Sequence, residues 1–186
     1  MAVGLGNPGK EFAGTRHNAG ADTIERLATR HGQHLRGGRY NSLVAEAVVG
    51  GRRLALAVPI TYMNESGLAV AALVRRYGIE DLAGLVVVHD ELDLPVGKMQ
   101  VKAGGGLAGH NGLRSIKAHL RSEAFTRVRI GIGKPPGGKD HGADHVLRPP
   151  GRRERTELDV TIEAAADAVE WVLAEGVVAA QNRFNG

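Results

Sequence analysis

Short runs with a strand-like pattern alternate along the chain with longer runs that have helical spacing. Residues 2–5 form a brief apolar run typical of a buried strand. Residues 19–31 predict a helix that Asn18 caps, with apolar side chains on one face at Ala21, Ile24, Leu27 and Ala28. Residues 42–59 predict a hairpin, because two strand-patterned runs meet at Gly50 and Gly51.

The rest of the chain continues this alternation. A helix capped by Asn64 or Ser66 is expected to run toward Tyr77, and the β-branched run within 84–93 predicts a strand buried on both faces. The later predicted elements are a turn at 95–97, a strand over 98–102, a helix over 111–120, a strand over 125–133, a mobile loop over 134–145 and a helix over 152–175. We therefore expect residues 1–186 to form one α/β domain, with a mixed, mostly parallel, twisted β-sheet flanked by α-helices.

Composition narrows the class of protein without identifying it. The 186 residues suffice for one domain with a sizeable core, and the absence of cysteine excludes disulfides, a thiolate nucleophile and cysteine-ligated zinc. The net charge of +4 favours a polyanionic partner, yet one tryptophan, three tyrosines and three phenylalanines are too few for the stacking arrays of single-strand RNA binders. No signal peptide or long apolar run is evident, so the expected location is the cytoplasm, away from membranes.

Two glycine motifs have the spacing of a dinucleotide-binding turn, but their surroundings do not support that function. In residues 4–9 the first predicted helix begins well after the third glycine, whereas a Rossmann turn opens directly into its helix. Residues 104–109 lack an acidic residue at the end of the following strand. We therefore expect no nucleotide cofactor.

A histidine and an aspartate carry the clearest chemical signal. His17 lies in a polar loop between a predicted strand and a predicted helix, and Asp90 lies near the end of the strand within 84–93. A half-buried carboxylate at that place could accept a hydrogen bond from Nδ1 of an imidazole, fix its tautomer and stabilise its protonated form. A solvated loop histidine is the alternative for His17. Glu91 and Asp93 are interpreted as a solvated acidic turn.

The sequence shows no protein nucleophile and no complete metal site. None of its four serines lies in a Gly-x-Ser-x-Gly motif, so water is the expected nucleophile if His17 and Asp90 act together. The pairs His31/His34 and His141/His145 have metal-ligand spacing, but each lacks a third ligand nearby. No metal and no other cofactor are expected.

Three asparagines, Asn7, Asn64 and Asn111, each stand where a predicted strand turns toward a helix. Turn and cap chemistry explains any one of them alone. Beside a His–Asp pair, however, three carboxamides could offer neutral donors and acceptors to an ester and its peptide.

Basic side chains crowd the part of the sequence around the second glycine motif. They form either a solvated face or a phosphate-contacting patch beside the helix N-terminus at Asn111, where backbone N–H groups also favour anions. The residues are Lys102, Arg114, Lys117, Arg127, Arg129 and Lys134.

Four blocks of this sequence, read in order, closely resemble bacterial peptidyl-tRNA hydrolases: GLGNPGKEFAGTRHNAG, PITYMNESG, HDELDLPVGKMQVKAGGGLAGHNGLRSI and FTRVRIGIGKPPG. The closing QNRFN is similar to that family's tail, so the resemblance runs from residue 3 to residue 185. It implies a monomer that hydrolyses the ester between a peptide and the terminal ribose of tRNA. Its substrate would be peptidyl-tRNA released prematurely, and its role the recycling of tRNA in translation and ribosome rescue.

The resemblance also implies roles for single residues. His17 would be the general base, Asp90 would stabilise its basic form, and Asn7 would help to distinguish blocked from free aminoacyl ends. Asn64 and Asn111 would hold the substrate and the water. In the same family the residues matching Phe12, Tyr62 and Met63 line the pocket, and those matching Lys102 and Arg129 contact tRNA phosphate.

Three positions depart from the family pattern. Phe12 stands where tyrosine is usual, Val58 where lysine is frequent, and Gln100 where a basic residue is common. These changes bear on the strength of substrate binding and not on the type of reaction. The alternative function is a non-catalytic RNA-binding protein on the same fold, and the presence of His17, Asp90 and the three asparagines speaks against it.

Overall fold

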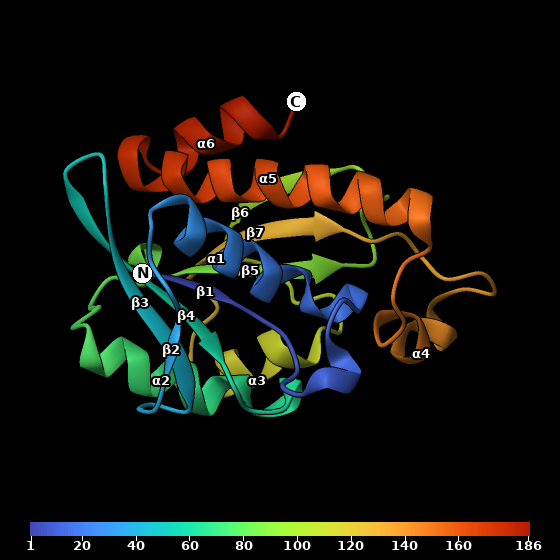
Figure 1. Cartoon of the computed structure of the whole chain (residues 1–186), viewed down its shortest axis with the longest axis horizontal. Helices are drawn as coiled ribbons and strands as arrows, with labels where there is room; N and C mark the ends of the chain where they lie inside the picture. The colour runs from blue at the N-terminus through green and yellow to red at the C-terminus, as the bar shows by residue number, and fades with distance from the viewer.

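The computed structural model describes residues 1–186, apart from the side chain of Lys139. Its seven strands form one mixed sheet in the order β2-β3-β4-β1-β5-β7-β6 (Figure 1). The four central strands are mutually parallel: β4 (Arg52–Pro59), β1 (Ala2–Gly4), β5 (Val86–Glu91) and β7 (Thr126–Gly131). The outer strands pair antiparallel: β2 (Arg36–Gly37), β3 (Ser42–Val49) and β6 (Met99–Ala103).

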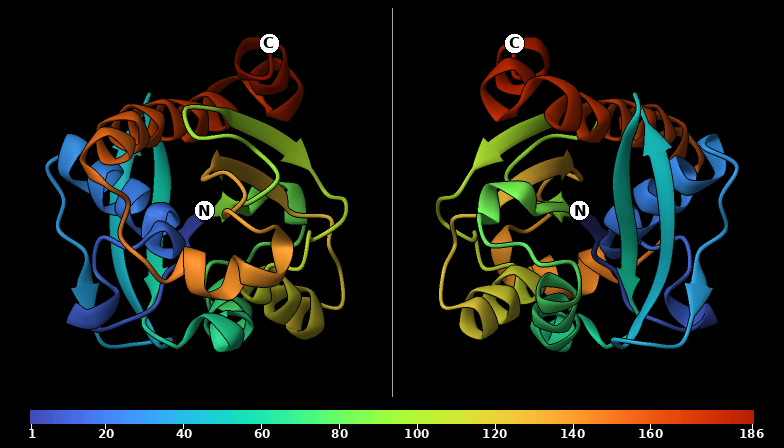
Figure 2. Two further views of the ribbon diagram at one scale, coloured as in Figure 1. Left: turned by 90° about the vertical axis from the view of Figure 1, so that its right-hand side faces the viewer. Right: turned by 90° about the vertical axis from the view of Figure 1, so that its left-hand side faces the viewer.

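Helices cover both faces of this sheet, as the views in Figures 1 and 2 show. On one face, α1 (Ala19–Arg30), α5 (Arg152–Glu175) and α6 (Val177–Phe184) pack over a core that includes Val86 and Val88 of β5. On the other face, α2 (Ser66–Arg76) and α3 (Asn111–Leu120) pack over Val87. Successive residues of a strand point to opposite faces, so a continuous apolar run is required for a strand buried on both.

Glycines bring α1 unusually close to the strands beneath it. A Cβ on Gly4 of β1 would lie 2.2 Å from the carbonyl oxygen of Gly20, and a Cβ on Gly20 would lie 2.1 Å from that of Val88. A side chain at either position would therefore force the helix away from the sheet. The first glycine of the sequence motif thus serves helix–strand packing, and it brings the start of α1 close to the end of β5.

Most sequence predictions of secondary structure are confirmed, including the hairpin, the helix over 111–120 and the helix over 152–175. The mixed sheet between helix layers is confirmed as well, with its parallel pairing confined to the centre. The prediction of a loop over 134–145 is wrong in its second half, where a 3-10 turn, η5 (Lys139–His141), leads into α4 (Gly142–Val146). The sequence reading also missed α6, after which the Asn185 side chain hydrogen-bonds both main-chain groups of Val101 on the edge strand β6.

The predicted helix caps are wrong. Asn18 precedes α1 without capping it, and α2 follows the 3-10 turn η3 (Met63–Glu65) with no side-chain cap from Asn64 or Ser66. Instead, the Ser66 hydroxyl donates to the carbonyl oxygen of Met63. None of the helices, over the described residues, is both long and apolar enough to cross a lipid bilayer.

One carboxylate between α1 and α5 is a source of pH-dependent stability. Burial raises the pKa of Asp22 to about 6, although the Arg155 guanidinium, 3.6 Å away, acts in the opposite direction. The folded state therefore binds this proton more tightly than the unfolded chain does. Stability is then higher below the unfolded pKa and is lost as the pH rises toward about 6.

Replacing Asp22 with asparagine is expected to raise the free energy of unfolding by about 1–3 kcal/mol at neutral pH, because the variant carries no charge at this half-buried position. The gain should fade as the pH falls toward about 4, where Asp22 of the parent protein is protonated. Urea denaturation at the two pH values measures the difference. An equal gain at both would show that the charge of Asp22 is not its cause.

Candidate functional site

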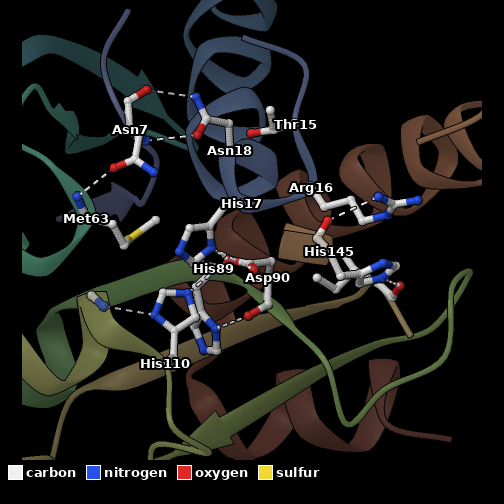
Figure 3. Close-up of polar contacts among 12 residues, drawn as sticks. Asn7, Thr15, Arg16, His17, Asn18, Met63, His89, Asp90, His110 and His145 are labelled. Carbon is white, nitrogen blue, oxygen red and sulfur yellow. Dashed lines mark hydrogen bonds and ion pairs between the residues drawn. The ribbon is translucent and has the colours of Figure 1, made fainter. Parts of the chain in front are cut away.

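The carboxyl ends of the central strands bring His17 and Asp90 into contact. His17 lies in the 3-10 turn η2 (Arg16–Asn18) that leads into α1, and Asp90 lies near the end of β5. Nδ1 of His17 is 3.0 Å from Oδ1 and 2.9 Å from Oδ2 of Asp90 (Figure 3). Both side chains are buried, and the carboxyl edge of parallel strands is where α/β proteins commonly form their sites. The predicted His–Asp pair is thus formed by the fold.

A second imidazole binds the same carboxylate. Nε2 of His110 is 2.9 Å from Oδ1 of Asp90, and its Nδ1 faces the backbone N–H groups of Gly112 and Leu113, at 3.1 and 3.3 Å. Because Nδ1 accepts those two hydrogen bonds as the N-terminal cap of α3, the ring proton of neutral His110 is on Nε2. His110 therefore donates to Asp90.

The electrostatics determine the protonation states of Asp90 and His17. Burial acts to raise the pKa of Asp90, but His17 and His110 beside it outweigh burial and hold that pKa well below its usual range. Burial acts to lower the pKa of His17, but the charge of Asp90 and the hydrogen bond to it raise that pKa above 6.5. Asp90 is then an acceptor, Nδ1 of His17 a donor, and Nε2 of neutral His17 keeps a free lone pair. That nitrogen can accept a proton.

Asn18, the residue after His17, holds the loop that carries Asn7. Asn18 accepts from the backbone N–H of Asn7 at 2.8 Å through Oδ1 and donates to its carbonyl oxygen at 3.0 Å through Nδ2. The backbone N–H of Met63 donates to Oδ1 of Asn7 at 2.7 Å, which directs Nδ2 of Asn7 away from that contact (Figure 3). Asn18 thus holds a neighbouring loop instead of capping a helix, and Asn7 presents an amide donor.

A pocket of about 300 Å³ opens beside the dyad. Its lining residues are His17, Asp90–Asp93, Ala108–Asn111, Gly142, Ala143 and Val146. Of the predicted site residues, His17, Asp90 and Asn111 line this pocket. The lining does not include the other predicted site residues near the substrate, which are Asn7, Phe12, Tyr62, Met63 and Asn64. Met63 is buried, whereas Tyr62 and Asn64 are exposed.

The basic residues do not form one uniform solvated face. Arg127 is buried and donates to the carbonyl oxygen of Gly104, while Arg129 contacts Glu91 at 3.4 Å and donates to Gln100 at 2.8 Å. The expectation of a solvated Glu91 is wrong. Glu91 is the last residue of β5, and its side chain is only 2% exposed. Lys102 is half-buried on the neighbouring strand, opposite Arg127.

Three of these side chains, His17, Asp90 and His110, have ligand atoms within 4.8 Å of one another, close enough to hold a metal ion. Coordination through Nε2 of His110 would move the ring proton to Nδ1, where two backbone N–H groups already donate. A metal would therefore disrupt the cap of α3. The donor set fits hydrogen bonding to an ionised Asp90 better than it fits a metal centre.

Sequence reasoning missed His110 and misassigned Asn18. The block GHNGL places His110 directly before a helix whose start was predicted correctly, which was the available signal for a capping side chain. Its second bond, to Asp90, joins residues 20 apart along the chain and depends on how α3 sits on the sheet.

Comparisons with known proteins agree with this geometry. A family model described as peptidyl-tRNA hydrolase matches residues 1–186. The peptidyl-tRNA hydrolase of Frankia casuarinae is 49% identical, covering 100% of this chain and 93% of its own, and that of Chloroflexus aggregans is 48% identical, covering 100% and 98%. The crystal structure of the Acinetobacter baumannii peptidyl-tRNA hydrolase is similar with a TM-score of 0.93 at 39% identity, covering 100% of this chain and 93% of that one.

Proposed function

The chain belongs to the peptidyl-tRNA hydrolase family, and we propose that it hydrolyses the ester bond between a peptide, or an N-blocked aminoacyl group, and tRNA. The observation that carries this proposal is the free Nε2 of a histidine whose Nδ1 is bonded to a buried, ionised aspartate. Such a histidine is a general base, and the sequence offers no protein nucleophile for it to activate. Water is the nucleophile.

The reaction follows from this protonation pattern. Nε2 of His17 takes a proton from water as the water oxygen attacks the ester carbonyl, and Asp90 stabilises the imidazolium that forms. The tetrahedral intermediate collapses by breaking the bond to the ribose oxygen, which receives the proton from His17. The products are a free carboxylic acid and tRNA with its terminal hydroxyl restored.

The asparagines supply neutral hydrogen-bonding groups around this reaction. Asn7 presents Nδ2 because its Oδ1 is occupied by Met63, and it serves to distinguish blocked from free aminoacyl ends. Asn111, at the start of α3 and on the pocket wall, donates to the developing oxyanion and holds the water. Asn64 helps to bind the substrate, and Phe12, Tyr62 and Met63 provide the apolar surface for the peptide.

We propose the same domain organisation, partner and location that the sequence predicts. Residues 1–186 act as one domain, as a monomer in the cytoplasm, with peptidyl-tRNA as the partner and no cofactor. The non-catalytic RNA-binding alternative is not favoured, because an RNA-binding surface alone gives no reason for a buried carboxylate that binds two histidines.

A comparison of two substrates tests the proposed function. The purified protein is expected to hydrolyse N-acetyl-aminoacyl-tRNA and to leave the same tRNA with a free aminoacyl group nearly intact. Release of labelled amino acid over time measures both rates. Equal rates would contradict the role of Asn7, and no hydrolysis of either substrate would contradict the activity.

Lys102 and Arg129 are proposed to contact tRNA phosphate, so their removal should act through binding. Lys102→Ala is expected to raise KM at low salt and to reduce the slope of log KM against log salt concentration by about one unit, with kcat unchanged. Arg153→Ala is the matched control, since Arg153 is exposed on α5, lies outside the candidate phosphate-contacting patch, and pairs with Glu157 at 3.6 Å. An unchanged salt slope for Lys102→Ala would count against a phosphate contact.

A further inference from the structure

Arg16, the residue before His17, is buried, and all three nitrogens of its guanidinium bond to the segment that follows β7. Its Nε and Nη2 bind the two carboxylate oxygens of Glu154 at 2.7 and 2.9 Å. Its Nη1 donates to the carbonyl oxygens of His145 and Arg148 at 3.1 and 3.2 Å. A guanidinium occupied in this way is unavailable to a phosphate or to the reacting ester.

These bonds converge on α4 and its connection to α5. His145 belongs to α4, Arg148 follows it, and Glu154 lies in the first turn of α5. The backbone N–H of Arg16 also donates to the carbonyl oxygen of Arg148, at 3.2 Å. Figure 3 shows Arg16 directed toward His145 and away from Asn7, and Figure 1 places α4 beyond the carboxyl ends of the central strands.

The tethered segment forms one wall of the pocket beside the dyad. Gly142, Ala143 and Val146 of α4 line it together with His17 and Asp90. Among the described residues, the α4 side chain that hydrogen-bonds to the rest of the protein is His145, whose Nε2 lies 3.3 Å from the Ile132 carbonyl oxygen. Glu154 is held ionised, because the hydrogen bond from Arg16 lowers its pKa. The strongest link between this wall and the catalytic turn is therefore Arg16.

We propose that Arg16 is a positioning residue that fixes α4 as the wall of the substrate pocket while His17 performs the chemistry. This inference rests on the proposed function. The His17–Asp90 bond joins η2 to β5 and does not pass through α4, so loss of Arg16 leaves the base intact. Only the molecules with α4 in place then bind the substrate fully, and the apparent affinity is reduced in proportion to that fraction of molecules.

Arg16→Gln is expected to raise KM for N-acetyl-aminoacyl-tRNA about tenfold or more, since charge-assisted hydrogen bonds of this kind shift an equilibrium by about that factor. kcat should change less than about threefold, and the acid limb of its pH profile should not move. Glu154→Gln keeps Arg16 and its two carbonyl bonds, so it is expected to give the same pattern with a smaller rise in KM. It also provides a second reading if Arg16→Gln folds poorly.

Amide hydrogen exchange in the free protein gives a readout that needs no substrate. Amides over residues 142–148 should exchange about tenfold faster in Arg16→Gln, whereas those of β5 should keep their protection. Arg30→Gln is the matched control. Arg30 lies on α1 and binds Asp167 and Glu163 of α5 at 2.9 and 2.8 Å, away from the pocket, so neither exchange over 142–148 nor KM should change.

Three outcomes would overturn the proposal. The first two are unchanged exchange over residues 142–148 in Arg16→Gln and a fall in kcat with unchanged KM. The third is an effect of equal size in Arg30→Gln, because the cause would then be general loss of stability. Failure of the parent protein to hydrolyse N-acetyl-aminoacyl-tRNA would instead contradict the proposed function. In that case the exchange measurement still decides whether Arg16 holds α4 in place.

Discussion

Replacing His17 with alanine is expected to lower kcat/KM for N-acetyl-aminoacyl-tRNA about 10³-fold, the scale of general-base catalysis, while the protein stays folded. The reason is specific to Nε2 of His17, which has a free lone pair because Nδ1 is engaged by Asp90. Without that nitrogen, water must attack without losing its proton to a positioned base. KM should change little, since the substitution leaves Asn7 and Asn111 in place.

The control for this prediction is His34→Ala, which removes an exposed histidine outside the pocket. Circular dichroism and thermal unfolding verify that both variants are folded before their rates are compared. Turnover of His17→Ala within a few-fold of the parent would contradict the assignment of the general base. An equal loss in His34→Ala would point to a damaged preparation.

Asp90→Asn is expected to produce the second large effect, a fall in kcat of about 10²- to 10⁴-fold with activity still measurable. An asparagine has one carbonyl oxygen and one amide N–H₂ group where Asp90 has two acceptors. His17 Nδ1–H and His110 Nε2–H both donate to Asp90, so the amide must face one of them with its own donor. Either the tautomer of His17 or the cap of α3 is then disturbed.

The pH profile separates this charge effect from a structural one. Asp90 raises the pKa of His17 above 6.5 against the opposing effect of burial, so activity of the parent protein should fall as the pH drops through that raised pKa. In Asp90→Asn burial remains and the charge is gone, so the acid limb of kcat should move to lower pH. Stopped-time assays across about pH 5–9 measure both profiles. A lower kcat with an unchanged acid limb would show that Asp90 acts through packing alone. The control is Asp167→Asn, which changes an exposed carboxylate on α5.

The regular elements were predictable because their signals are local. The helix over 111–120 and the hairpin over 42–59 each rest on the spacing of apolar side chains within one segment, and both match the structure. The short helix α4 was missed since five residues among glycines and histidines give almost no periodicity. Its position is fixed by Arg16 and by contacts with residues far away in the sequence.

The candidate site likewise has features that were predictable from the sequence and features that were not. Residue type and local order were enough to predict the α/β alternation, the strand that ends in Asp90, the polar loop with His17 and the lack of a protein nucleophile. Four further features depend on how the elements pack: His110 shares Asp90, Asn18 holds Asn7, Glu91 is buried against Arg129, and Arg16 ties α4 to the catalytic turn. Each of these pairs joins separate elements, so its hydrogen bonds exist only once the helices have packed on the sheet and excluded water.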